Sequence, residues 1–242
     1  MRIEKYLGTT KEEVESKKFN ICIGVSLGNK YFTKENIRKY ILWALEHTKE
    51  DILVLIPDRI HAINIEALQD YNKLRAFKVA IRKGDEKEAE VKEIIAELPD
   101  EKQSLIKIAR WREVTSSKYH DYRIELVSEE FEKKGDFYNY VTSIVKENYK
   151  NSPHKLTPER IEKLSKYILY ELPVFFNGVR HGVYKKEDVD ANGVRKYNLM
   201  PYPGLNKFDE LVIGLQNGTI FPELSKKIKQ TNKMAFVEAY VD

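Results

Sequence analysis

Short apolar segments alternate along this chain with longer amphipathic ones, and this alternation constrains the fold more than any other feature. The apolar segments are rich in β-branched residues and are predicted to be buried strands at residues 19–26, 51–57, 105–110 and 234–241. The amphipathic segments are predicted to be helices at residues 33–45, 65–83, 87–98 and 157–172, with one or two more helices over residues 121–148, interrupted near Gly135. Strands that alternate with helices pair in parallel and are covered on both faces, so we expect an α/β fold.

Length and composition are typical of one folded domain. The chain has 242 residues, 42% of them apolar, and no low-complexity linker, so we expect a single domain over residues 1–242 with an N-terminal extension at residues 1–18. The segment 177–203 is rich in glycine and proline and is predicted to be an irregular functional loop.

The cysteine content and the absence of long apolar stretches limit the possible surroundings of the protein. A single cysteine, Cys22, cannot form an internal disulfide, and no Cys/His spacing resembles a metal site. No segment is apolar over the length of a signal peptide or a membrane span. We therefore expect a cytoplasmic monomer that binds no metal and no membrane.

Ser26 is the candidate nucleophile because it closes the first predicted strand. Ligands of open α/β sheets bind at the carboxyl ends of strands. Gly24 lies two residues earlier and so faces the same side of the sheet, where its missing side chain leaves room for a ligand. A serine at a strand end is also a common helix cap, so this position alone does not establish catalysis.

The sequence from Gly24 to Gly28 matches the G-x-S-x-G pattern of serine hydrolases. In α/β-hydrolases, however, the nucleophile follows several other strands, whereas Ser26 follows the first. None of the five histidines falls in a recognisable arrangement with Ser26. A serine esterase or acyltransferase acting on small substrates stays open as an alternative.

A second candidate pair lies on the predicted helix at residues 157–172. Thr157, Pro158 and Glu159 form a strong helix start, and the helix is expected to stop at Pro173. Glu171 falls at the edge of its apolar face, with Tyr167 one turn earlier on the same side. A carboxylate there needs a partner, either a nearby lysine or a substrate ammonium.

The predicted helix at residues 65–83 carries a stripe of positive charge. Its basic residues are Lys73, Arg75, Lys78, Arg82 and Lys83. A solvated helix face usually mixes both signs, so a stripe of one sign indicates a polyanion such as RNA. A non-catalytic RNA-binding module is therefore a further alternative.

Two long motifs together resemble the tRNA-dependent cyclodipeptide synthase family. The first runs from Gly24 through Ser26 and Asn29 to Tyr31 and Phe32. The second joins Tyr167, Glu171, Pro173 and Phe175. The family also has a tyrosine before a helix, which matches Tyr202, and the resemblance covers the chain from about residue 19 to its end.

This resemblance implies a Rossmann-like parallel sheet flanked by helices, similar to the catalytic domains of class I tyrosyl- and tryptophanyl-tRNA synthetases. It implies a ping-pong reaction on two aminoacyl-tRNAs, without ATP or any other cofactor, through an aminoacyl-enzyme and a dipeptidyl-enzyme on Ser26. Glu171 and Tyr167 would hold the α-ammonium and Tyr202 would transfer protons. The basic helix, including Arg75, would bind tRNA.

Some assignments stay open in the sequence. Family members either have the asparagine matched by Asn29 or follow the tyrosine with proline, and this chain has both Asn29 and Pro203. Tyr197 is an alternative to Tyr202. The walls of the substrate pocket are predicted to include Cys22, Gly24, Leu53 and Val174, but the two amino acids that are joined do not follow from the sequence.

Overall fold

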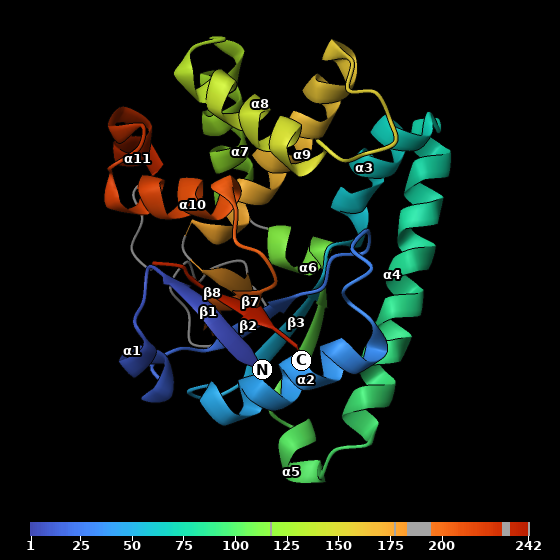
Figure 1. Ribbon diagram of the computed structural model, residues 1–242, viewed down its shortest axis with the longest axis vertical. Coiled ribbons are helices and arrows are strands. Elements are labelled where there is room, and N and C mark those ends of the chain that lie inside the picture. The colour runs from blue at the N-terminus through green and yellow to red at the C-terminus, as the bar shows by residue number, and fades with distance from the viewer. Residues whose placement is uncertain (117, 177, 183–194, 229–232, 242) are drawn as a thin grey trace.

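The computed structural model describes the chain except residues 117, 177, 183–194, 229–232 and 242, and its centre is a six-stranded sheet with helices on both sides (Figure 1). In spatial order the strands are β1 (Arg2–Leu7), β8 (Ala235–Tyr240), β7 (Leu199–Tyr202), β2 (Ile21–Gly24), β3 (Ile52–Ile56) and β4 (Ile106–Arg110). From β8 to β4 all neighbours pair in parallel, while β1 runs antiparallel to β8. The predicted α/β fold with a parallel sheet is confirmed.

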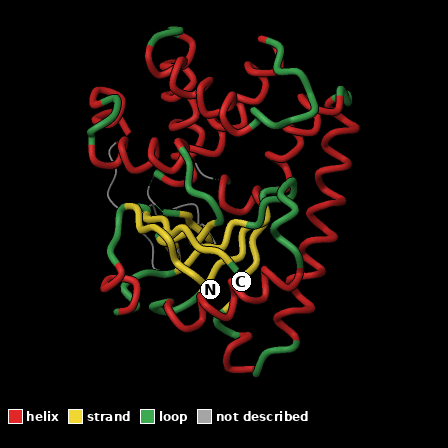
Figure 2. Tube along the Cα trace, in the orientation of Figure 1, coloured by secondary structure: helices red, strands yellow, loops and turns green. Residues whose placement is uncertain are grey.

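Helices form a layer on each face of this sheet (Figure 2). One face is covered by α2 (Lys34–His47) and the C-terminal half of α4 (Lys73–Ala96). The other carries a group of helices that rises above the sheet in Figure 1: α6 (Trp111–Thr115), α7 (Lys118–Glu132), α8 (Asp136–Asn148), α9 (Pro158–Phe175), α10 (Lys207–Asn217) and α11 (Pro222–Ile228). The remaining helices are α1 (Lys11–Glu15), α3 (Asp58–Gln69) and α5 (Asp100–Gln103).

Successive residues of the central strands enter opposite layers of the core. Ile21 and Ile23 of β2 pack in the layer of α2 and α4, whereas Cys22 packs in the layer of α6–α11. All three side chains are fully buried. A strand buried on both faces reads as a continuous apolar run, which is why β2, β3 and β8 were predicted from the sequence.

The order of the strands indicates where a ligand would be expected to bind. From β2 the chain proceeds through α2 to β3 on one side, while β7 pairs on the other side of β2. The connections therefore diverge between β2 and β7. In open α/β sheets, the crevice at the carboxyl ends of two such strands is the usual binding site. Ser26 follows β2 and Tyr202 ends β7, so both lie at this position.

Two strands of the six-stranded sheet, and both strands of a separate pair, were not predicted. β1 lies inside the segment expected to be an N-terminal extension, and pairs along β8 from Arg2 to Leu7. β7 lies inside the predicted irregular loop at 177–203, which also contains the antiparallel pair β5 (Val179–His181) and β6 (Arg195–Tyr197). Pro201 argued against a strand, but it pairs with Val237 of β8. On the other side β7 pairs with β2 at Leu199 alone, so Pro201 lies beyond the β2 ladder. Residues 183–194 of the predicted loop lie outside the described residues.

The predicted helices at residues 65–83 and 87–98 are wrong in their boundaries. The helix expected at residues 65–83 is interrupted after Gln69, because Asp70 adopts a left-handed conformation with φ of 53°. Asn72 then caps the next helix by accepting a hydrogen bond from the Arg75 N–H at 2.9 Å. From there α4 continues without interruption to Ala96, through Gly84. The basic stripe therefore starts a helix of its own.

The predicted stop of the next helix at Pro173 is also wrong, because α9 continues through this proline to Phe175. Proline removes one backbone hydrogen bond from a helix interior. Leu172, Pro173, Val174 and Phe175 are all buried, and their packing offsets that loss.

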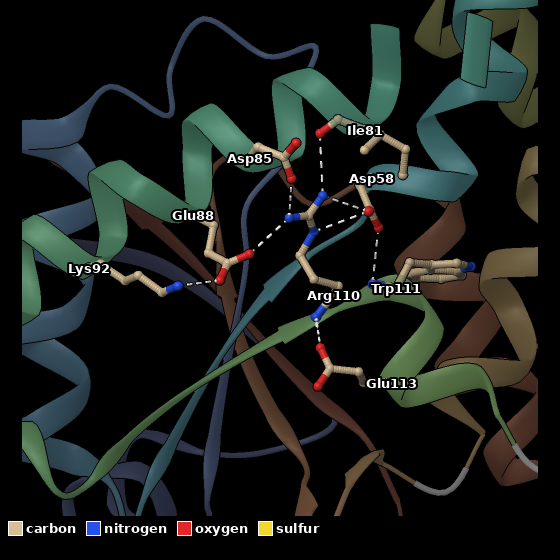
Figure 3. A network of polar contacts seen from close by, with 8 residues as sticks. All are labelled: Asp58, Ile81, Asp85, Glu88, Lys92, Arg110, Trp111 and Glu113. Carbon is tan, nitrogen blue, oxygen red and sulfur yellow. Dashed lines mark hydrogen bonds and ion pairs between the residues drawn. The ribbon is translucent and has the colours of Figure 1, made fainter. Parts of the chain in front are cut away.

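An arginine holds α4 against the carboxyl ends of β3 and β4 (Figure 3). The Arg110 guanidinium donates to Asp58 from Nε at 3.1 Å and from Nη2 at 2.8 Å, and to Asp85 and Glu88 at 2.8 Å each. Asp58 also accepts the N–H of Trp111 at 3.2 Å. A side chain at residue 84 would collide with this arrangement, since a Cβ there would lie 2.4 Å from Arg110 Nη2.

Replacing Asp58 by Ala should lower the free energy of unfolding by about 3–5 kcal/mol, because it leaves Arg110 without its buried partner. The Asp58 side chain is 4% exposed, whereas Asp85 is 64% exposed. The control Asp85→Asn should therefore lower it by at most about 1 kcal/mol. Urea unfolding measures both variants, and equal losses would show that burial does not set the strength of this network.

Candidate active site

A cavity of about 200 Å³ lies at the carboxyl edge of the sheet, where β2 and β7 diverge. Its walls come from the ends of these strands and from α3, α6, α8, α9 and α10. Four predicted catalytic residues line this one cavity: Ser26, Tyr167, Glu171 and Tyr202. They come from three separate parts of the chain, and the fold brings them together.

Ser26 stands two residues beyond the end of β2 and is partly exposed to the cavity. Gly24 lines the same cavity, as its position on the strand predicted. A Cβ at Gly24 would lie 3.2 Å from the Met200 side chain, which is tighter than ordinary contact. The absence of a side chain at Gly24 therefore lets Met200 of β7 pack closely against β2. As a result, the space beside Ser26 is narrow.

Tyr202 is connected to the nucleophile segment by hydrogen bonds with the side chains of Ser26 and Asn29. Burial and the neighbouring Glu171 raise the pKa of Tyr202 to about 12, although these two hydrogen bonds counteract the rise. The phenol is therefore protonated at neutral pH and able to donate to an oxygen at Ser26. Asn29 itself is exposed and accepts the N–H of Tyr31 at 2.9 Å, which shapes the turn after Ser26.

Glu171 and Tyr167 lie together on α9, with the Tyr167 hydroxyl donating to Glu171 Oε1 at 3.3 Å. Burial, and next the charge of Asp209, raise the pKa of Glu171 to about 8, against a smaller opposing effect of the Tyr167 hydrogen bond. Within the described residues no lysine or arginine pairs with Glu171 within 4.0 Å. An enclosed acid of this kind binds a cation well, because a bound ammonium would supply the missing partner.

Asp209 is a cavity residue that the sequence reasoning missed. It occupies the first turn of α10, where Asp209 Oδ2 accepts the N–H of Asn206 at 2.8 Å in a capping box. Burial raises the pKa of Asp209 to about 7, although hydrogen bonds from the backbone oppose that rise. The pair Asn206 and Asp209 was visible in the sequence as a helix cap, but no pattern placed it beside Glu171.

Stability should depend on pH through Glu171. Between its ordinary pKa of 4.5 and about 8, the unfolded chain has lost a proton that the native protein retains, so native stability falls as pH rises. Asp209 contributes in the same direction. Glu171→Gln cannot ionise, so relative to the unaltered protein its Tm should be unchanged at pH 5 and higher at pH 8. A gain of at least about 2–4 °C would correspond to roughly 1 kcal/mol in a chain of this size.

Thermal unfolding at the two pH values measures this effect. Glu162→Gln on the same helix is the control, since Glu162 is 44% exposed and pairs with Lys134. It should show no gain at pH 8. An equal difference between Glu171→Gln and the unaltered protein at both pH values would contradict a raised pKa at Glu171.

Three predicted wall residues do not line the cavity. Cys22 and Leu53 are fully buried in the core, two residues further from the carboxyl edge than Gly24 and Leu55, which do line it. Burial also raises the pKa of the Cys22 thiol. On α9, Val174 is buried in the core and Phe175 lines the cavity instead. Cys22 and Leu53 were therefore assigned to the correct face of the sheet, but they lie too far from its carboxyl edge to reach the cavity.

Between the two candidate tyrosines, the geometry favours Tyr202. Tyr197 ends β6, is fully buried and does not line the cavity. Tyr202 ends β7, whose carboxyl end points to the cavity. Tyr202 at the end of β7 and Ser26, two residues beyond β2, therefore line the same cavity, as the strand order requires.

The basic residues of α4 divide into two groups. Arg75, Lys78 and Arg82 are exposed at helical spacing on one face. Arg82 pairs with Glu86 at 2.7 Å, whereas the Arg75 guanidinium stacks over the Tyr71 ring at 3.9 Å. Away from this face, Lys73 lines a groove between α3, α4 and α7, and Lys83 is half-buried.

Comparison with known proteins gives the chain its class. The family model for cyclodipeptide synthase matches residues 6–181. No curated protein sequence matches the chain. In the part of the chain that the structure describes, no helix is both long and apolar enough to cross a membrane.

Solved structures share the fold over nearly the whole chain. A cyclodipeptide synthetase from Mycobacterium tuberculosis, described as related to type I tRNA synthetases, superposes with a TM-score of 0.71 and 16% identity, covering 100% of this chain and 96% of its own. A synthase from Fluoribacter dumoffii gives 0.69 and 14%, covering 96% and 95%. One from Staphylococcus haemolyticus gives 0.67 and 18%, covering 96% and 97%.

The fold and the family model agree. The chain belongs to the cyclodipeptide synthase family. It is an enzyme that makes cyclic dipeptides, and it has the α/β fold of the solved cyclodipeptide synthases.

Proposed function

We propose that this enzyme joins two aminoacyl groups from aminoacyl-tRNAs by a ping-pong mechanism, with Ser26 as the nucleophile and residues 1–242 acting as one domain. The observation that supports the proposal is that Ser26, Tyr167, Glu171 and Tyr202 all line one cavity, with the Tyr167 hydroxyl donating to Glu171. In this proposal Glu171 and Tyr167 form the ammonium receptor and Tyr202 is the proton donor. An aminoacyl ester is already activated, so orientation and proton transfer are the main requirements, and orientation alone contributes roughly 7–11 kcal/mol.

In the first step, Ser26 Oγ attacks the ester carbonyl of the first aminoacyl-tRNA. A new ester forms on Ser26, the bond to the ribose oxygen breaks, and the proton of Ser26 passes to that oxygen. Tyr202 is hydrogen-bonded to Ser26 and holds its proton at neutral pH, so it is suited to relay the proton. Glu171 and Tyr167 hold the α-ammonium of the bound group meanwhile.

In the second step, the α-amine of the Ser26-bound group attacks the ester carbonyl of the second aminoacyl-tRNA. A peptide bond forms, the second ribose hydroxyl leaves, and the product is a dipeptidyl-enzyme. The reverse polarity, in which the incoming amine attacks the Ser26 ester, would give a dipeptidyl-tRNA instead. The attacking ammonium must first lose a proton, and Glu171, with a pKa raised to about 8, is matched to accept it.

In the third step, the amine of the second residue attacks the Ser26 ester. The nitrogen–carbon bond closes the six-membered ring, the ester bond to Oγ breaks, and Oγ takes back a proton. The serine is then free for another cycle. No histidine is required, because each leaving group is an alkoxide that a phenol or a carboxylic acid can protonate.

Binding of tRNA should depend on the exposed basic face of α4. Replacing Arg75, Lys78 and Arg82 together by Ala should weaken binding at low salt by about tenfold or more. The slope of log affinity against log salt should fall by about 2–3, because up to three phosphate contacts are lost. Fluorescence anisotropy with labelled tRNA at several salt concentrations measures both quantities.

The control for this variant replaces Lys5, Lys226 and Lys227 by Ala, which removes the same charge from exposed positions elsewhere. This variant should keep the salt slope almost unchanged. If the two triple variants behave alike, the effect is one of net charge, and α4 is not the tRNA site.

Production of the protein in a bacterium, followed by mass spectrometry of the medium for diketopiperazines, tests the proposed function. A cyclic dipeptide that depends on Ser26 is the expected result. An esterase would instead hydrolyse simple activated esters without regard to charged tRNA. A non-catalytic RNA-binding module would bind tRNA and release no product.

A further inference from the structure

α3 carries two buried polar atoms that have no hydrogen-bond partner among the described residues. They are His61 Nε2 and Asn64 Oδ1, one helical turn apart. α3 follows β3, the strand beside β2, so its first turns lie close to the segment that carries Ser26. Neither atom has a role in the steps described above.

The two residues differ in what they face. The His61 imidazole lies beneath the turn after Ser26, since a Cβ at Gly28 would be 3.1 Å from His61 Cε1. It is 8% exposed and does not line the cavity. Asn64 does line the cavity, together with Ser26, Glu171 and Tyr202. Asn64 therefore lines the same space as the nucleophile, and its side-chain oxygen is a buried acceptor with no hydrogen-bond partner among the described residues.

An unpaired buried acceptor destabilises the empty protein, because it has given up hydrogen bonds to water without replacement. Such groups are rare in native proteins, and each calls for a specific explanation. At an active site the explanation is a ligand that brings the missing donor. Asn64 Oδ1 accepts hydrogen bonds only, so the donor must be an N–H or O–H group of the substrate.

We propose that Asn64 binds the α-amine of the second aminoacyl group and positions it for ring closure. This inference rests on the proposed function of the same site. The first α-amine is already assigned to Glu171, which Tyr167 accompanies. Asp209 is the other carboxylate of the cavity, and it accepts the Asn206 N–H. Among the described residues that line the cavity, Asn64 is the one with a buried side-chain acceptor that has no hydrogen-bond partner.

Asn64 is uncharged, which suits it to binding the attacking amine. An amine attacks only when it is unprotonated, and a carboxylate at the same place would stabilise its ammonium form. A carboxamide oxygen accepts an N–H of the neutral amine and leaves the nitrogen lone pair free. The nitrogen then bonds to the carbonyl carbon of the Ser26 ester, the ester bond breaks, and Oγ receives the proton.

Replacing Asn64 by Leu tests the inference, because leucine has a similar size and no polar atom. Purified protein is mixed with two aminoacyl-tRNAs and quenched at intervals, and the species on Ser26 are identified by intact mass. We expect aminoacyl-enzyme to form at the unaltered rate, ring closure to slow about tenfold or more, and dipeptidyl-enzyme to accumulate. The Tm should stay the same or rise, because an unpaired buried oxygen has been removed.

Two further variants sharpen the test. Asn64→Asp places a carboxylate at the amine, so ring closure should be slow at neutral pH and recover as pH rises. Gln69→Leu is the matched control: it removes a carboxamide from the same helix at an exposed position away from the cavity. It should close the ring at the unaltered rate.

The possible outcomes separate this inference from the proposed function. If the unaltered protein never carries an acyl group on Ser26, the proposed function fails, and this inference with it. If it does, but Asn64→Leu closes the ring at the unaltered rate, only the role of Asn64 is wrong. Slowed formation of the aminoacyl-enzyme, or a lowered Tm with every step slowed, would equally overturn that role.

Discussion

Ser26→Ala should lower the rate of cyclic dipeptide formation by at least about 1,000-fold, because it removes the atom to which both acyl intermediates are attached. The side chain is only partly exposed and takes no part in the core, so folding should be unaffected. The measurement is product formation by the purified protein with aminoacyl-tRNAs, followed by mass spectrometry.

Two controls make this result specific to the chemistry. Ser143→Ala removes a hydroxyl that donates to its own helix, at the carbonyl oxygen of Tyr140 at 2.7 Å, and it should keep full activity. The Ser26→Ala protein should still bind tRNA with the same salt dependence, since Ser26 is not on the basic face of α4. Product at near the normal rate would show that another group, or no covalent intermediate, carries the reaction.

Glu171→Gln should have the second-largest effect, a loss of about 100-fold or more in kcat/KM. Glutamine has the same shape and still accepts the hydrogen bond from Tyr167, but it offers no charge to an ammonium and accepts no proton. Loss of a charged hydrogen bond and of a proton acceptor each contribute about 10²-fold or more. Steady-state kinetics with purified aminoacyl-tRNAs measures the loss.

The control for Glu171→Gln is Glu162→Gln, on the same helix and outside the cavity, which should keep kcat/KM within about twofold. In Glu171→Gln the aminoacyl-enzyme should form slowly and fail to advance to the dipeptidyl-enzyme. A variant with normal kcat/KM would mean that the enclosed carboxyl group is not the receptor of the substrate ammonium.

The sequence predicted the parts of the site that lie on regular elements. Ser26 was predicted from the end of a buried apolar run, and the strand order places that end at the binding crevice. Tyr167 and Glu171 were predicted to share a helix face from their spacing, and their side chains are in contact. In both cases the repeat of the strand or helix determines which way the side chain points, so the sequence alone is sufficient.

Features that depend on the assembled fold were not predictable in this way. Asn64 and Asp209 became cavity residues because α3 and α10 pack against the same crevice, and nothing in their local sequence indicates it. Cys22 and Leu53 were assigned to the correct face but the wrong depth, since period-two alternation gives no position along a strand. β7 was missed because it is short and contains Pro201, although it pairs with β8 along its whole length.

The most direct test of the account is the mass of the protein after mixing with a single aminoacyl-tRNA. We expect one covalent adduct with the mass of one aminoacyl residue, located by peptide mapping at Ser26 and absent from Ser26→Ala. Addition of the second aminoacyl-tRNA should convert this adduct into cyclic dipeptide. Product formation without any adduct, or an adduct on a different residue, would contradict the central claim that Ser26 carries the growing dipeptide.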